Sequence, residues 1–145
     1  MPQFQPRDPA YADRVADTFR DGSASSRWGG ELASLFPGVV EITLSFFNAT
    51  TGGPGTLHRC IVASLLDDAC LLAALSLASP GDLVATAEYK LNILAPADGS
   101  QVTARAQVLR PGRSITVCRA DAFADGRLTA RMLATLAVSA VSRPP

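Results

Sequence analysis

The residues with the clearest chemical potential surround a short segment that leads into a long apolar stretch. This segment, Gly55-Thr56-Leu57-His58-Arg59-Cys60, holds the sole histidine, and Asp67 follows that histidine by nine positions. We predict a helix here, which places Asp67 about two and a half turns inside it. Its neighbours there are the apolar residues Leu65, Leu66, Ala69 and Leu71. The backbone N–H groups at the start of the helix lie at the positive end of its dipole and can bind an oxyanion. Donors for a developing oxyanion and a carboxylate that activates water or attacks a carbonyl are the two parts that thioester hydrolysis requires.

A second acid, Asp68, follows Asp67 directly. Helix geometry separates the side chains of neighbouring residues by about 100°, so the two carboxylates are expected to have different roles. Acidic residues in helices usually cap, pair with an arginine or face solvent, and spacing alone leaves that interpretation open for either residue.

A catalytic pair formed by His58 and Cys60 is disfavoured. Side chains two residues apart at a helix start diverge, and the sequence shows no third group that would orient the imidazole. We expect His58 to hydrogen-bond the loop, and Cys70 and Cys118 to lie in the core. One histidine and scattered acids do not support a metal site, so no metal or other cofactor is expected.

Local patterns predict two helices with one or two strands between them. A first helix, capped by Asp8 with Pro9 at its first position, is predicted to end near residues 21–22. Residues 39–46 alternate in the manner of a strand with one buried face. The glycine-rich segment 52–55 is predicted to be a loop without regular structure, and it leads into the long helix, residues 58–78.

Tight turns near residues 97–99, 110–112 and 124–126 divide the rest of the chain into four strands, which we expect to pair as an antiparallel meander. A helix that is apolar on nearly every face needs cover all round, and a strongly curved sheet provides it. The predicted fold class is therefore α+β, a hotdog fold in which a curved antiparallel sheet wraps around one long central helix, with an extra N-terminal helix.

Composition limits the class of protein. The chain has 145 residues, 48% of them hydrophobic, which fits a single domain over residues 1–145 with flexible tails at 1–7 and 140–145. Its 13 basic and 13 acidic residues cancel, which disfavours nucleic acid as a partner. The odd number of cysteines without CxxC spacing argues against a disulfide framework, and the N-terminus lacks the features of a secretion signal. The apolar run contains two acids, so a membrane span is disfavoured, and a cytoplasmic protein is expected.

Several motifs occur together in one order along residues 28–138. The first is Gly55-Thr56-Leu57-His58 with Asp67 nine residues after the histidine. Next come Thr-Ala-Glu-Tyr-Lys at 86–90 and Asn-Ile-Leu-Ala-Pro-Ala-Asp-Gly at 92–99, followed by Val-Leu-Arg-Pro-Gly-Arg at 108–113. In this combination the sequence resembles the hotdog acyl-CoA thioesterases related to the phenylacetate-degradation enzyme.

The resemblance implies an acyl-CoA thioesterase and assigns roles to individual residues. Asp67 takes the position of the catalytic carboxylate, and the backbone N–H groups near Arg59 and Cys60 take that of the donors to the thioester carbonyl. Thr86 takes the position of a hydroxyl that assists the attacking water. The family's site forms between two subunits, which implies a homodimer or a homotetramer. Coenzyme A is expected as part of the substrate.

Further residues are assigned to substrate binding, and some of them depart from the family pattern. They are Gly52, Leu57, His58, Asp68, Arg110 and Arg113, the two arginines as partners for the phosphates of the coenzyme. Gly52 stands where relatives often carry a polar amide, and Arg59-Cys60 replace paired glycines. An arginine at a helix start opposes the dipole, so an anionic partner is expected for Arg59.

Two alternatives remain. One is a catalytically weak hotdog dimer that binds an acyl thioester or another small anionic ligand. The other is hydration of an enoyl thioester, which is disfavoured because the long helix holds no histidine beyond its start.

Overall fold

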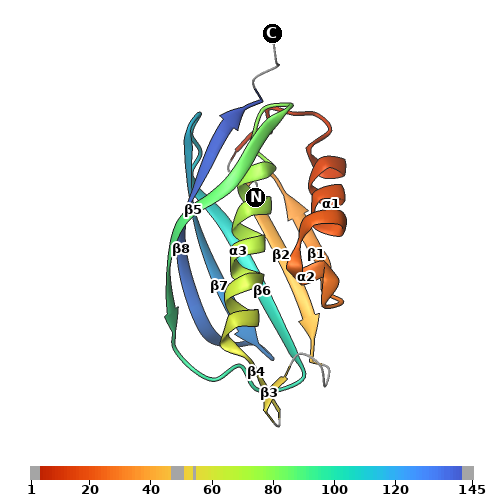
Figure 1. The fold of residues 1–145 in the computed structure, drawn as a ribbon, viewed down its shortest axis with the longest axis vertical. Coiled ribbons are helices and arrows are strands. Elements are labelled where there is room, and N and C mark those ends of the chain that lie inside the picture. The colour runs from red at the N-terminus through yellow and green to blue at the C-terminus, as the bar shows by residue number, and fades with distance from the viewer. Residues whose placement is uncertain (1–3, 47–50, 54, 142–145) are drawn as a thin grey trace.

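The structure is a computed structural model that describes residues 4–46, 51–53 and 55–141. A six-stranded antiparallel sheet, in the order β1-β2-β6-β7-β8-β5, curves around the long helix α3 (Figure 1). The helices are α1 (Tyr11–Gly22), α2 (Ala24–Arg27) and α3 (Arg59–Leu75), and the strands are β1 (Glu31–Phe36), β2 (Val39–Ser45), β3 (Thr51–Gly53), β4 (Thr56–Leu57), β5 (Asp82–Ile93), β6 (Gln101–Arg110), β7 (Ile115–Ala124) and β8 (Arg127–Ala140). This confirms the prediction of an α+β hotdog fold with an extra N-terminal helix.

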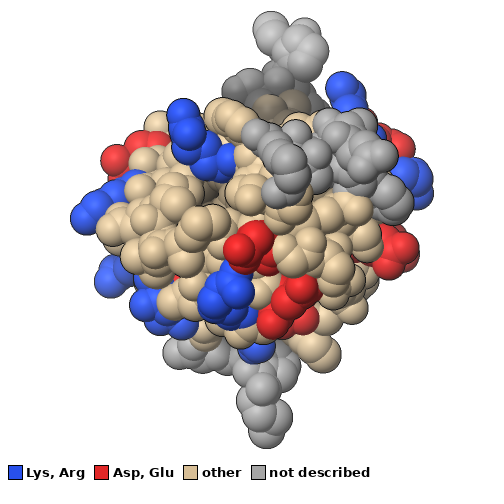
Figure 2. All heavy atoms as spheres, turned by 90° about the horizontal axis from the view of Figure 1, so that it is seen from below, with Lys and Arg blue, Asp and Glu red and all other residues tan. Residues whose placement is uncertain are grey.

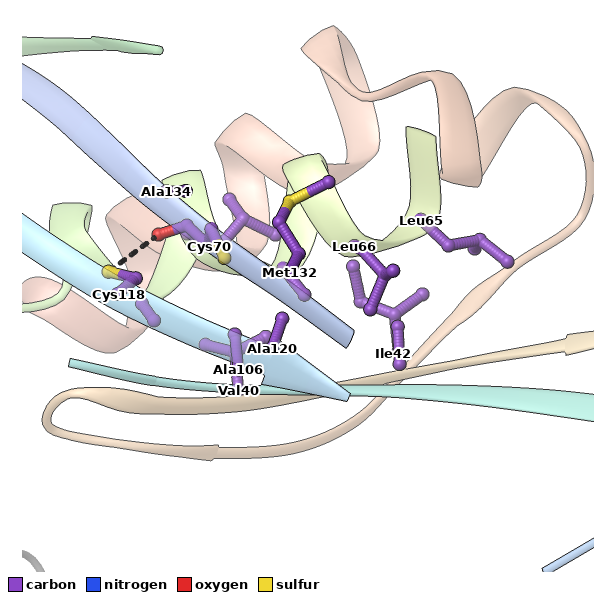
Figure 3. Packing of buried hydrophobic residues seen from close by; sticks show 14 of the residues in the cluster. Val40, Ile42, Leu65, Leu66, Cys70, Ala106, Cys118, Ala120, Met132 and Ala134 are labelled. Carbon is purple, nitrogen blue, oxygen red and sulfur yellow. Dashed lines mark hydrogen bonds between the residues drawn. The ribbon is translucent and has the colours of Figure 1, made fainter. Parts of the chain in front are cut away.

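Helix α3 is buried because apolar residues occur on most of its circumference. Leu65, Leu66 and Cys70 pack against residues from several strands, among them Ile42 and Met132 (Figure 3). The strands beneath the helix present mostly small side chains, namely Ala104, Ala106, Ala120, Ala122, Ala130 and Ala134, all of them buried. These small residues let β6, β7 and β8 approach the helix closely.

The predicted alternation in the first long strand is confirmed. In β2 the residues Val40, Ile42 and Leu44 are fully buried, and the residues between them are partly exposed. The same period of two recurs in β6 and β7, where every second side chain faces α3. Cys70 and Cys118 are buried and free, as expected of core residues.

The predicted meander of four strands is wrong for its first strand, β5. Strands β6, β7 and β8 pair consecutively, but β5 pairs with β8 and forms the edge of the sheet. The chain after β5 does not turn back on it, because the segment that follows is bound elsewhere: Leu94 N–H donates to Thr129 O at 2.8 Å, and Leu57 N–H donates to Ala97 O at 2.8 Å. These bonds carry the chain past the start of α3 before it enters β6 on the far side.

The prediction of a loop without regular structure at residues 52–55 is also wrong in part. Thr51–Gly53 forms β3, which pairs antiparallel with β4 through Thr51↔Leu57 and Gly53↔Thr56. The register shifts between Thr51 and Gly53, so Gly52 is the unpaired residue of a bulge. Glycine is common at such positions because it adopts backbone conformations that other residues avoid.

Helix ends differ from the predictions by a few residues. Helix α1 begins at Tyr11 with Ala10 as N-cap, and Asp8 Oδ1 instead accepts the Ala10 N–H at 2.9 Å in the turn before it. Helix α3 ends at Leu75, after which Ser76 Oγ donates to Ala73 O at 2.6 Å. The glycine- and serine-rich segment after α1 also holds the short helix α2.

Part of each predicted tail, 1–7 and 140–145, belongs to the folded domain. Phe4 packs against the core, and β8 continues to Ala140. The remaining tail residues, 1–3 and 142–145, lie outside the described residues. In the described part of the chain, no helix has the length and apolar character needed to cross a membrane.

Candidate active site

Asp67 and Thr86 meet where α3 crosses the edge strand β5. Thr86 Oγ1 donates a hydrogen bond to Asp67 Oδ1 at 2.6 Å, and both side chains are half-buried. The acid follows the buried residues Leu65 and Leu66 in α3. The structure therefore brings together the two residues that the resemblance assigned to the carboxylate and its assisting hydroxyl.

The backbone of β5 is irregular at this point. The register of β5 with β8 shifts between Thr86 and Glu88, which marks a β-bulge. A bulge redirects the side chains on either side of it, and bulges are over-represented beside active sites. Here the irregularity adjoins the residue whose hydroxyl meets Asp67.

Asp68 has a different environment from Asp67, as the helix geometry predicted. Asp68 Oδ2 accepts hydrogen bonds from the backbone N–H of Ser25, at 2.9 Å, and from the hydroxyl of Ser25. Burial raises the pKa of Asp68 above its usual range, and the two hydrogen bonds from Ser25 oppose that rise. Asp68 thus joins α2 to α3, and its predicted contact with substrate stays a prediction.

The start of α3 has one backbone N–H without an acceptor in the ranges that the structure describes. His58 is the N-cap residue, and its Nδ1 accepts the Cys60 N–H at 3.1 Å, which confirms that His58 hydrogen-bonds this segment. The Ile61 and Val62 N–H groups donate to His58 O at 2.9 Å and 3.3 Å. The first four N–H groups of α3 are those of residues 59–62. Of these, only the Arg59 N–H has no acceptor among the described residues.

A cavity of about 410 Å³ lies beside the start of α3. We call it the α3 pocket. It is lined by Thr56, Leu57, His58, Arg59, Val62, Ile93, Leu94, Ala95, Pro96, Ala97, Thr129 and Ala130. Its walls are mostly apolar, and Arg59 is the charged residue in its lining. Figure 2 shows this end of the molecule, where uncharged residues cover much of the surface and acidic and basic side chains are scattered among them.

Within one chain, the carboxylate and the available N–H are too far apart to act on the same carbonyl. Arg59 and Asp67 are separated by eight residues of α3. At 1.5 Å per residue this corresponds to about 12 Å along the helix axis. A reacting carbonyl needs both groups at about 3 Å.

The other predicted substrate-binding residues lie in separate places. Leu57 lines the α3 pocket and is buried, whereas Gly52 lies in β3. Arg110 ends β6, and Arg113 lies in the following turn, where it lines a second cavity of about 470 Å³ with Arg7, Ser79 and Asp82. Ser79 and Asp82 follow the end of α3, so Arg113 lies at the end of the helix opposite to Arg59.

Some of the site was not predicted from the sequence. The motif at residues 92–99 was used for the resemblance and a turn was expected near 97–99, yet Ile93, Leu94 and Pro96 form a wall of the α3 pocket. Its single proline and single glycine are typical of a turn, and they gave no sign that the segment would fold over the start of α3. Among the described residues, no group of three or more His, Cys, Asp or Glu side chains is placed to hold a metal ion.

The fold and this site together define a hotdog protein with an acid in its central helix and, within the described part of the chain, an amide without an acceptor at the helix start. Comparison with solved structures gives a thioesterase family protein from Silicibacter pomeroyi, 41% identical, with a TM-score of 0.83 and 88% of this chain and 97% of that chain covered. A thioesterase from Haemophilus influenzae is 26% identical, with a TM-score of 0.80 and coverages of 88% and 90%. A phenylacetic acid degradation-related protein from Ralstonia eutropha shares the fold at 20% identity, with a TM-score of 0.76 and coverages of 88% and 98%.

Residues 68–137 match the sequence profile described as the acyl-CoA thioesterase N-terminal domain. The sequence matches none of the curated proteins with which it was compared. The chain belongs to the thioesterase family with the hotdog fold.

Proposed function

We propose that this protein hydrolyses acyl-CoA thioesters, with Asp67 as the catalytic carboxylate. The observation that carries the proposal is the contact between Asp67 and Thr86, which fixes an acid of the central helix against the bulged edge strand. The membership of the chain in the thioesterase family supports the same reaction class.

The carboxylate can act in either of two ways. It takes a proton from a water molecule as that water attacks the carbonyl carbon, or it attacks the carbon itself and water then hydrolyses the mixed anhydride. In both routes the C–S bond breaks, the acyl group leaves as a carboxylic acid, and the sulfur of coenzyme A takes up the proton. The Thr86 hydroxyl occupies Oδ1 of Asp67, which leaves Oδ2 for the reacting water or carbon.

The start of α3 supplies the donor for the carbonyl oxygen. Because the Cys60 N–H donates to His58 Nδ1, we assign the donor role to the Arg59 N–H. It lies at the positive end of the helix dipole, where it stabilises negative charge as the oxygen becomes an oxyanion.

The site is completed by a second copy of the chain. A single chain separates Asp67 from the Arg59 N–H by about 12 Å along the helix, so each must act with the other group of a partner subunit. Strand β5 offers an edge for such a partner: Leu83, Tyr89 and Ile93 are 61%, 44% and 48% exposed. Long edge strands with exposed apolar side chains tend to pair with another chain. In such a dimer Asp67, midway along α3 of one subunit, lies beside the Arg59 N–H at the start of α3 in the other.

The test is release of free thiol from a panel of aromatic and aliphatic acyl-CoA thioesters. We expect turnover by the wild type and a fall in kcat of about 10²- to 10⁴-fold in Asp67→Asn and Asp67→Ala, since these variants lack the general base or nucleophile. Unchanged turnover in both variants would remove Asp67 from the mechanism. Tight binding of acyl-CoA by a wild type without turnover would favour a binding protein instead.

The donor role of Arg59 can be tested without disturbing the helix. Arg59 is the first residue of α3, where proline is favoured, and His58 already has the extended backbone (φ −63°, ψ 137°) that a following proline requires. Arg59→Pro therefore removes the N–H together with the side chain while keeping the helix start, and it is expected to lower kcat by about 10²- to 10³-fold relative to Arg59→Gly, which removes the side chain alone. Arg59→Gly keeps the N–H and serves as the matched control, and equal loss in both variants would contradict the assignment.

A further inference from the structure

The α3 pocket is a preformed apolar cavity. The segment that forms its outer wall is held by hydrogen bonds to two other elements: the Leu94 and Ala95 N–H groups donate to Thr129 O at 2.8 Å and 3.1 Å, and Ala97 O accepts from Leu57 N–H. Val62 and Pro96 add apolar surface. Fixed walls of this kind suit the hydrocarbon part of a ligand.

The side chain of Arg59 introduces a positive charge into this apolar lining. Arg59 is exposed at the start of α3, where a cation is disfavoured by the helix dipole. None of the six ion pairs formed between described residues includes Arg59. Asp98, which follows the pocket residue Ala97, is paired with Arg127. An anion bound in the pocket would pair with the Arg59 guanidinium and offset the unfavourable interaction of its charge with the helix dipole.

The position of Arg59 limits what that anion can be. In the proposed mechanism the N–H of the same residue binds the thioester oxygen, so the guanidinium reaches only groups a few bonds from the carbonyl. The phosphates of coenzyme A lie at the far end of the pantetheine arm, several times farther away. A carboxylate on the acyl group itself, roughly four or five carbons long, lies within the reach of an arginine side chain.

We propose that the α3 pocket selects dicarboxylic acyl thioesters, with the Arg59 guanidinium bound to the terminal carboxylate of the acyl group. The inference rests on the proposed function, because it uses the Arg59 N–H as the donor to the carbonyl. It adds the substrate class and makes the side chain of Arg59 a determinant of specificity.

The test compares acyl groups of equal length that differ only in the terminal carboxylate: succinyl-CoA against butyryl-CoA, and glutaryl-CoA against valeryl-CoA. We expect kcat/KM of the wild type to favour the dicarboxylic member of at least one pair by on the order of ten- to hundredfold. Arg59→Gln should abolish this ratio, and Arg59→Lys should retain part of it. Arg119→Gln, at an exposed arginine outside the pocket, is the matched control and should keep the ratio.

A binding measurement separates this inference from the proposed function. In the Asp67→Asn background, titration calorimetry should show tighter binding of glutaryl-CoA than of valeryl-CoA, and the difference should vanish when Arg59→Gln is added. Equal affinities there, or equal kcat/KM for both members of each pair, would overturn the inference even if the protein hydrolyses other thioesters. Absence of all turnover with a retained difference in affinity would overturn the proposed function alone.

Discussion

The contact between Thr86 and Asp67 joins two residues that are 19 positions apart in the sequence and half-buried in the fold. A hydrogen bond to a charged group contributes about 1.5–3 kcal/mol, so loss of the hydroxyl should weaken the positioning of the carboxylate. We predict that Thr86→Val lowers kcat by about ten- to hundredfold with little change in KM, because the substrate does not depend on Thr86 for binding. Thr86→Ser keeps the hydroxyl and should restore most of kcat in the same steady-state assay. A rise in KM at constant kcat would instead indicate a role in binding.

Protonation of Asp68, the acid next to Asp67, affects the stability of the fold. Burial raises its pKa, so the folded protein binds a proton more tightly at Asp68 than the unfolded chain does. The stability that depends on this proton is present below the unfolded pKa of about 3.9 and is lost as pH rises through the raised folded pKa.

We therefore predict that the unfolding free energy of the wild type, relative to Asp68→Asn, falls as pH rises from about 4 and then becomes constant. Urea unfolding of both proteins between acid and neutral pH measures this difference. A difference that grows with pH would mean that the hydrogen bonds from Ser25 outweigh burial and that the direction of the pKa shift is wrong.

At the scale of elements, the hairpin between β7 and β8 depends on one glycine. Its two-residue turn consists of Asp125 and Gly126, with φ of 45° and 81°, the left-handed pair that matches the twist of the strands. A Cβ added at Gly126 meets no atom within 4 Å, so the cost of Gly126→Ala is confined to the backbone. We predict a loss of about 1–2 kcal/mol in unfolding free energy. Gly22→Ala, at the open end of α1, is the control and should be neutral or slightly stabilising.

Most elements could be predicted because their signals are local. The alternation around Val40, Ile42 and Leu44 and the apolar run of α3 are patterns within one segment, and the turns at Gly112 and Gly126 are marked by their own residue types. The pairing of β5 with β8 is not local: nothing in β5 identifies its neighbour, and the segment after it is directed by bonds to Thr129 and Leu57. The sequence therefore located β2 and the four strands after α3, but not β1, β3 or β4, and it misplaced β5 in the order of the sheet.

The candidate site shows the same division. The positions of Asp67 and Thr86 came from a resemblance in motifs, and the contact between them is present in the fold. The partner of Asp68 was not predicted, because Ser25 is 43 residues away in a segment for which the sequence predicted no helix. The occupation of the Cys60 N–H by His58, which leaves that of Arg59, depends on a rotamer that no sequence pattern specifies.

We propose that the reacting groups of this protein come from two subunits. One chain contains both Asp67, with its bond to the Thr86 hydroxyl, and the Arg59 N–H. These two groups are about 12 Å apart along the axis of α3. The exposed edge at β5 provides a surface through which two copies can associate. Neither half is expected to hydrolyse a thioester alone.

The most direct measurement is thiol release by a mixture of two inactive variants. Asp67→Ala lacks the carboxylate and Arg59→Pro lacks the N–H donor, so each homodimer should be inactive. When the two are co-expressed in equal amounts, half of the dimers are mixed, and each mixed dimer has one intact site. We predict recovery of about a quarter of wild-type kcat. A co-expressed mixture that is no more active than either variant alone would contradict a site shared between subunits.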